Sequence, residues 1–220
     1  IRRYGGQSDN AEQAWELIKN ANYDSGVRLT PELFGLRTGG VPKNIGKKDI
    51  GYDAEDLENA LRLLLEDFDR FSGSEGYLYD LSEIMRQICS NYTVLKYHEV
   101  IDARDAKDLE AFRQAKEEFL NAFDVLNEVQ KTRQNQLAGE WIGKAQDRAA
   151  EYDDFSKSTF EMNAKSLITT WGSSGGSLVD YGFRTYEGMF LDLIKSNWTE
   201  YLDQVEQNLI DGTAIDVPSN

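Results

Sequence analysis

The chain has 220 residues, 40% of them hydrophobic, and a formal net charge of −15 from 24 Lys and Arg against 39 Asp and Glu. This acidity argues against a nucleic-acid partner and against docking on an anionic membrane, because clustered cations recognise both. One cysteine (Cys89) and one histidine (His98) exclude a disulfide framework and a His/Cys metal cage within this chain, so we expect no metal and no cofactor. No apolar run is long enough for membrane insertion. Length and apolar content predict one folded domain over residues 1–220.

The first part of the chain predicts a helix followed by a long loop. Residues 9–21 have helical apolar spacing, and Ser8 or Asp9 is a suitable N-cap. Residues 24–52 contain six glycines and two prolines without a clear apolar period. We therefore expect a long irregular loop there, of the kind that is often functional.

The middle of the chain contains no proline between residues 43 and 217, which permits long helices. Asp53 is expected to cap a helix that runs to about Phe71. The apolar stripes predict further helices, which cover residues 77–101, 106–131 and 135–156, with another that follows to Trp171. Asp102 to Asp105 predicts a short polar break, with a continuous helix as the alternative.

The last third of the chain is divided by a loop rich in Gly and Ser at residues 172–176. After this loop, apolar residues recur at spacings of three and four from Tyr186 to Val205, and Gly212 is expected to end this helix. No segment alternates as a strand would. The predicted fold is therefore all-α, a bundle of about seven mostly antiparallel helices with one long irregular loop at about 24–52.

Four side chains around the Gly/Ser loop form the candidate site: Asn163, Trp171, Asp180 and Tyr181. Aromatic rings pack against the C–H faces of sugars, while amide and carboxylate groups hydrogen-bond to sugar hydroxyls. This combination favours a sugar-binding site. The residues also permit a structural role, in which Trp171 and Tyr181 are core residues that fix the ends of the flanking helices.

The stretch from Glu161 to Gly172, followed by Leu178 to Tyr181, resembles the C-terminal helical domain of the α-N-acetylglucosaminidases, glycoside hydrolase family 89. That family has an Asn and an Arg, then Ile/Leu-Thr-x-Trp-Gly, then Asp-Tyr-Ala. Further matching segments occur in order along the chain: Arg3–Gly5, Tyr52–Leu64, Tyr79–Leu81, Arg86–Gln87, Gly188 and Trp198. The resemblance therefore covers nearly the whole chain.

Three positions depart from the family pattern. Lys165 stands where the family has Arg, Ser173 where many members have Pro, and Gly182 where Ala is usual. Lysine cannot make the bidentate contacts of arginine. These departures affect the geometry expected of the loop more than the identity of the domain.

The resemblance implies an enzyme that removes terminal α-linked N-acetylglucosamine with retention, through two glutamates on a (β/α)₈ barrel that precedes this domain. We therefore expect no catalytic residue in this chain, which would be inactive alone. Its implied partners are that barrel and a glycan with a terminal α-N-acetylglucosamine, and its implied substrate-binding residues are Trp171, Tyr181, Asp180 and Asn163. A stand-alone helical module that binds carbohydrate or protein is the alternative. Low cysteine and proline contents favour a secreted or cell-surface bacterial enzyme over a lysosomal one. An apolar surface patch is expected near residues 172–181 or 24–52, where a neighbouring domain would pack.

Overall fold

The computed structural model describes residues 2–21, 52–169 and 185–213. Within these ranges every regular element is a helix and no strand occurs, which confirms the predicted all-α class. The predicted loop at residues 24–52 lies outside the described residues, apart from Tyr52. The elements, with 3₁₀ and π segments labelled η, are η1 (Arg2–Tyr4), α1 (Asp9–Lys19), α2 (Ala54–Glu66), α3 (Phe68–Phe71), α4 (Glu75–Ala106), α5 (Leu109–Lys131), η3 (Gln134–Gln136), α6 (Ala138–Arg148), α7 (Asp154–Ile168), η4 (Phe190–Lys195) and α8 (Ser196–Asp211).

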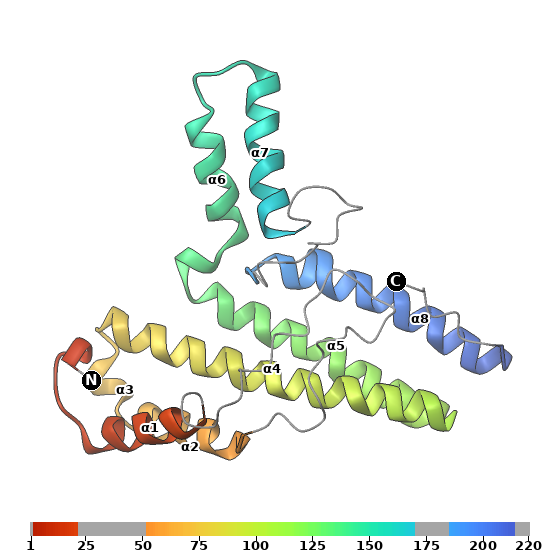
Figure 1. Cartoon of the computed structure of the whole chain (residues 1–220), viewed down its shortest axis with the longest axis horizontal. Coiled ribbons are helices and arrows are strands. Elements are labelled where there is room, and N and C mark those ends of the chain that lie inside the picture. The colour runs from red at the N-terminus through yellow and green to blue at the C-terminus, as the bar shows by residue number, and fades with distance from the viewer. Residues whose placement is uncertain (1, 22–51, 170–184, 214–220) are drawn as a thin grey trace.

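Three long helices build the larger core. α4 and α5 lie side by side in opposite directions, and α8 packs on α5, again antiparallel (Figure 1). Aromatic rings fill the space between them, and Phe119 meets the Trp198 ring edge-on at 5.2 Å. The principal buried residues of this first core are Val94, Tyr97, Phe112, Phe119, Phe123, Leu126, Phe190, Ile194, Trp198 and Leu202.

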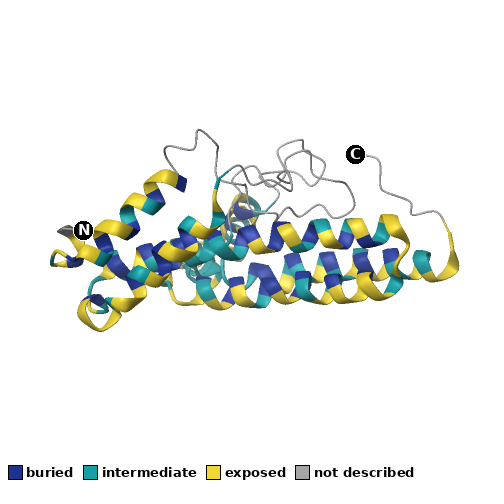
Figure 2. Ribbon diagram, turned by 90° about the horizontal axis from the view of Figure 1, so that it is seen from below, coloured by how far each residue is buried: buried dark blue, intermediate teal, exposed yellow. Residues whose placement is uncertain are grey.

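A second core lies at the N-terminal end of α4, where α1, α2 and α3 pack against it (Figure 1). The Tyr77 hydroxyl donates to the Leu64 carbonyl at 2.5 Å and so ties α4 to α2. Both cores use residues of α4, so this 32-residue helix joins them. Figure 2 shows the buried inner faces of these helices and their exposed outer faces.

Short polar side chains begin most of the helices. Each of the following accepts a backbone N–H of the first turn and so satisfies a donor that the helix itself leaves unpaired: Ser8, Asp53, Ser74, Asp108 and Asp153. The predictions of an N-cap at Ser8 or Asp9 and of one at Asp53 are therefore confirmed. The last helix also ends as predicted, with Gly212 in the left-handed region at φ +64°.

The predicted helix from Asp53 to Phe71 is wrong in one respect, because it divides at Asp67. The Asp67 backbone leaves the helical region at φ −96° and ψ 9°, and its carboxylate accepts the Ser8 hydroxyl. The change of direction lets Phe71 reach the second core, where its ring lies 5.7 Å from that of Tyr77. The division therefore serves packing that local sequence does not reveal.

The predicted break at Asp102 to Asp105 is also wrong, and the alternative of a continuous helix holds. α4 runs on to Ala106 because Ala103 is buried against the first core while Asp102 and Asp105 point to solvent. The helix ends at Lys107, which adopts φ +57°.

The predicted helix at residues 135–156 is observed as shorter pieces. Leu137 is extended and pairs with Glu187 in one isolated parallel bridge, so α6 starts only at Ala138. α6 ends at Arg148, and α7 then runs back along it (Figure 1). No described helix has both the length and the hydropathy needed to cross a membrane.

Candidate functional site

The structure places only one of the four predicted site residues. Asn163 is exposed on α7, five residues before the helix ends at Ile168. Trp171, Asp180 and Tyr181 lie outside the described residues, as do Leu178 and Val179. Whether these side chains meet Asn163 stays a prediction. What the structure does define is how the chain is held immediately before residue 170 and immediately after residue 184.

α7 carries the chain toward residue 170. Its first turn is fixed by Asp153, whose carboxylate accepts the Ser156 backbone N–H at 3.0 Å. This hydrogen bond, together with one that the Ser156 hydroxyl donates to the same carboxylate, holds the pKa of Asp153 below its usual range. Farther along, Ala164 and Ile168 are buried, so this side of α7 faces inward and Asn163 lies beside it.

Trp141 of α6 contacts one residue before position 170 and another after position 184. Its indole N–H donates to the Ala164 carbonyl of α7 at 2.8 Å. Its ring stacks on that of Tyr186, with centroids 6.3 Å apart and planes inclined at 29°. One side chain therefore links the helix that leads into the 170–184 segment with the residues that follow it. In the sequence, Trp141 is one of the apolar residues of the helix predicted at residues 135–156, and nothing local to it reveals this role.

Buried amides of α5 hold the residues that follow the segment. Gln130 donates to both the carbonyl and the hydroxyl of Thr185, each at 3.3 Å. Asn127 accepts the Gly188 backbone N–H at 2.9 Å. Gly188 has φ +88°, a conformation that favours glycine. These hydrogen bonds fix Thr185 and Gly188 against α5.

A π-helical segment, η4, follows directly and leads into α8. It buries Phe190 and Ile194 in the first core, and Lys195 pairs with Asp124 of α5 at 2.6 Å. π-helical turns are rare and occur frequently near functional sites. Here η4 joins the described residues that start at Thr185 to the first core.

A polar cluster joins α4 to η3 at the base of α6. Glu83 accepts Gln136 at 2.8 Å and pairs with Arg86, also at 2.8 Å. Burial raises the pKa of Glu83. The hydrogen bond from Gln136 and the positive charge of Arg133 oppose this rise. The carboxylate therefore has structural partners on both sides. Within the described ranges no group of three or more His, Cys, Asp or Glu side chains is arranged to hold a metal ion.

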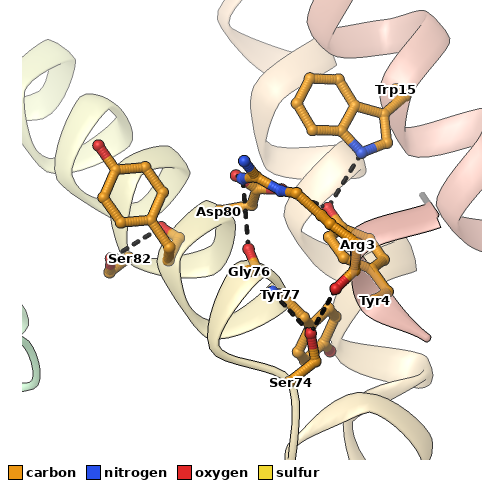
Figure 3. Close-up of polar contacts among 9 residues, drawn as sticks. Arg3, Tyr4, Trp15, Ser74, Gly76, Tyr77, Asp80 and Ser82 are labelled. Atoms are coloured by element: carbon orange, nitrogen blue, oxygen red, sulfur yellow. Dashed lines mark hydrogen bonds and ion pairs between the residues drawn. The ribbon is translucent and has the colours of Figure 1, made fainter.

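A second polar cluster fixes the start of the domain (Figure 3). The buried Asp80 carboxylate accepts the Tyr4 hydroxyl at 2.7 Å and forms an ion pair with Arg3. The Trp15 indole donates to the same Tyr4 hydroxyl at 3.0 Å, and Ser74 donates to the Arg3 carbonyl at 2.8 Å. These contacts anchor Arg3 and Tyr4 to α1 and to the start of α4.

A groove of about 520 Å³ lies between α4 and α5, beside the start of α2. Much of its described wall is apolar and includes Ile88, Leu95 and Val125. Cys89 also lines it, and burial raises the pKa of this thiol, which disfavours the reactive thiolate. None of the predicted site residues is part of the described wall.

Comparison with known proteins agrees with this architecture along the whole chain. Residues 1–219 match the family described as the α-N-acetylglucosaminidase (NAGLU) C-terminal domain. The human α-N-acetylglucosaminidase is 27% identical over 227 residues, which cover 99% of this chain and 28% of the human protein.

Solved bacterial structures show the same fold. A family 89 glycoside hydrolase from Clostridium perfringens in complex with 2-acetamido-1,2-dideoxynojirmycin has a TM-score of 0.88 and 28% identity, over 100% of this chain and 26% of that chain. The structure of that bacterium's enzyme with its substrate GlcNAc-α-1,4-galactose has a TM-score of 0.87 and 29% identity, with the same coverage. This chain spans little more than a quarter of the length of these relatives. It belongs to the α-N-acetylglucosaminidase C-terminal domain family, a part of the enzymes of glycoside hydrolase family 89.

Proposed function

We propose that this domain completes the substrate pocket of a retaining exo-α-N-acetylglucosaminidase. In this proposal it packs on a catalytic (β/α)₈ barrel outside these 220 residues and lines one side of the pocket with Trp171, Tyr181, Asp180 and Asn163. The observation that carries the proposal is the likeness over the full chain to a bacterial enzyme solved with a GlcNAc-containing substrate. The exposed position of Asn163 at the surface of α7 is compatible with this role.

Two described carboxylates, Glu206 and Glu83, are held by structural partners. Retention of configuration needs two carboxyl groups ~5–5.5 Å apart, one of which must be protonated to act as the acid. Glu206 is held by Lys116 and Arg113, which lower its pKa and favour the charged form. Glu83, whose pKa burial raises, is hydrogen-bonded by Gln136 and paired with Arg86. In this proposal the domain would bind and orient the sugar, while the barrel would supply the acid and the nucleophile.

Kinetics of the full-length parent enzyme test the pocket role. Loss of one ring stacked on the sugar removes about 1.4 kcal/mol of binding, so Trp171→Ala should lower kcat/KM on an aryl α-N-acetylglucosaminide about tenfold. Asn163→Ala should cause a smaller loss. Tyr92→Ala, an exposed aromatic of α4, is the matched control and should leave kcat/KM unchanged. If Trp171→Ala reduces only stability, and the folded enzyme keeps its kinetics, the pocket role is wrong.

The isolated 220-residue domain distinguishes this proposal from a stand-alone binding module. We expect no hydrolysis of the aryl substrate and no saturable heat of binding with N-acetylglucosamine, because a single wall offers too few contacts without its barrel. Saturable binding by the domain alone would support the module instead. Turnover by the purified domain would contradict the proposal altogether.

We also propose a secreted or cell-surface location for the parent enzyme. The single cysteine and the three prolines of this chain support a bacterial enzyme of that kind. An N-terminal export signal in the parent protein, tested by fractionation of cells and medium, is the expected result. Activity confined to the cytosol would contradict this location.

A further inference from the structure

The helical hairpin formed by α6 and α7 projects away from the two cores (Figure 1). α6 has no buried residue, and α7 buries only Ala164 and Ile168. Helices of 11 and 15 residues are marginal in water unless tertiary packing stabilises them. The packing visible within the hairpin is therefore small for an element of this length.

The side of α7 that faces α6 is defined by its contacts. Ala164 accepts the Trp141 indole N–H, and Glu161 accepts the Gln146 amide at 2.9 Å. On a helix with 3.6 residues per turn, Phe155 and Met162 are seven residues apart and lie on the opposite side. Thr159, four residues after Phe155, and Ser166, four residues after Met162, lie on the same side. We call these four residues, Phe155, Thr159, Met162 and Ser166, the outer face of α7.

The outer face carries two strongly exposed apolar side chains. Phe155 is 81% exposed and Met162 is 61% exposed, the highest values among the large hydrophobic residues that the structure describes. Exposed apolar residues are common singly, but two on one face of an element that buries so little elsewhere indicate an interface. Asn163 lies at the edge of the same face, one helical turn from Thr159 and from Ser166.

The relatives indicate what this interface meets. Nearly three quarters of the length of each matched enzyme lies outside the region that corresponds to this chain, which covers 26–28% of them. If Asn163 reaches a substrate pocket in the remainder of such an enzyme, then the helix face beside it must also lie against that remainder. The expected partner surface is an apolar concavity that receives one aromatic and one thioether side chain.

We propose that the outer face of α7 is the surface by which this domain docks on the remainder of its parent polypeptide, with Phe155 and Met162 as the anchors. This inference rests on the proposed function, because Asn163 is the residue that orients the face. It adds a named interface to that function, which is the outer face of α7.

Hydroxyl-radical footprinting of the full-length parent enzyme tests the docking directly. Each residue is compared between native and urea-unfolded enzyme, which cancels intrinsic reactivity. Phe155 and Met162 should be protected at least about tenfold, as buried groups are. Ile210, which is 50% exposed on α8, serves as the control and should show little protection. Labelling of Phe155 and Met162 at the rate of exposed side chains would overturn the proposal.

Dilution identifies the occupant of the face. Protection by the same polypeptide should not change on dilution by about a hundredfold, whereas protection by a second copy should disappear. A benzophenone amino acid at position 155 should crosslink within one polypeptide, to residues outside this domain. Crosslinks between two copies would overturn the assignment in favour of an oligomer contact.

A double variant separates docking from the pocket role. Phe155→Ser with Met162→Ser should increase hydrogen exchange at the α7 amides of the parent enzyme, while Ile210→Ser should not. Unchanged exchange would contradict the docking even if Trp171→Ala reduces kcat/KM. Increased exchange together with normal kinetics of Trp171→Ala would instead support the docking and contradict the proposed pocket role.

Discussion

The buried carboxylate of Asp80 explains two parts of the family pattern at once. The segments Arg3–Gly5 and Tyr79–Leu81 are far apart in the chain, yet they meet where Asp80 accepts the Tyr4 hydroxyl and pairs with Arg3 (Figure 3). The Arg3 guanidinium also lies 5.9 Å from the centre of the Tyr79 ring. Residues that sequence comparison treats as separate matches are therefore one contact that fixes the start of the domain.

Replacement of Asp80 by alanine should destabilise the domain strongly. The change leaves the buried Tyr4 hydroxyl and the Trp15 indole with a broken network, and hydrogen bonds to charged groups contribute about 1.5–3 kcal/mol each. We expect the free energy of unfolding in urea to fall by about 2–3 kcal/mol. Asp154→Asn, at a fully exposed residue 3.8 Å from Lys157, should change it by less than about 0.5 kcal/mol. Equal effects of the two variants would show that the cluster has no special role.

The residues of the candidate site were only partly accessible to sequence reasoning. Asn163 was identified by a motif within the helix predicted to run to Trp171, and its exposure was not predicted. Trp141 and Gln130 were missed because their partners, Ala164, Tyr186 and Thr185, are distant in the chain. A glutamine at an apolar-stripe position, four residues after Leu126, is the one local signal that could have indicated a fixed partner for Gln130.

At the level of elements, helix identity was predictable and helix ends were less so. Side chains that cap a first turn are local signals, and Ser8 and Asp53 acted as predicted. The ends at Asp67 and Lys107 depend on tertiary packing, because a buried Ala103 keeps the helix going through a charged stretch that alone suggests a break. Apolar periodicity therefore identifies a helix more reliably than it defines where that helix ends.

A network of ion pairs joins α5 to α8 and should make stability depend on pH. Glu206 pairs with Lys116 at 2.7 Å and with Arg113 at 2.6 Å, and these contacts, led by Lys116, hold its pKa below the usual range. A carboxyl group with a lowered folded pKa stabilises the protein above its unfolded pKa of about 4.3. That contribution is lost as the pH falls through the folded pKa.

Glu206→Gln should therefore cost stability at neutral pH and little at acid pH. We expect a loss of about 0.5–1 kcal/mol at pH 7, because the pairs are partly exposed and screened by salt. The difference from the unsubstituted protein should shrink below pH 4, as measured by urea unfolding at a series of pH values. The control is Glu117→Gln, which changes an exposed residue of the same helix, α5. A difference that stays constant from pH 7 to pH 3 would mean that Glu206 acts by packing and not by charge.

For the whole molecule, α4 is the element that makes two cores one folding unit. Its N-terminal half packs with α1, α2 and α3 in the second core, and its C-terminal half packs with α5 and α8 in the first. A helix without a break transmits the loss of order from one core to the other, since unfolding either end exposes backbone of the same element. The domain should therefore unfold in a single cooperative transition.

Two tryptophans make this cooperativity measurable. Trp15 is half-buried against the second core, and Trp198 is fully buried in the first. With fluorinated tryptophan, the ¹⁹F signals of both should disappear at the same urea concentration. Tyr92 is exposed near the middle of α4, and Tyr92→Pro breaks the helix there at a cost of about 3 kcal/mol or more. This variant should separate the two midpoints, whereas Tyr92→Ala should leave them together. Separate midpoints in the unsubstituted protein would show that the cores are independent and that α4 only connects them.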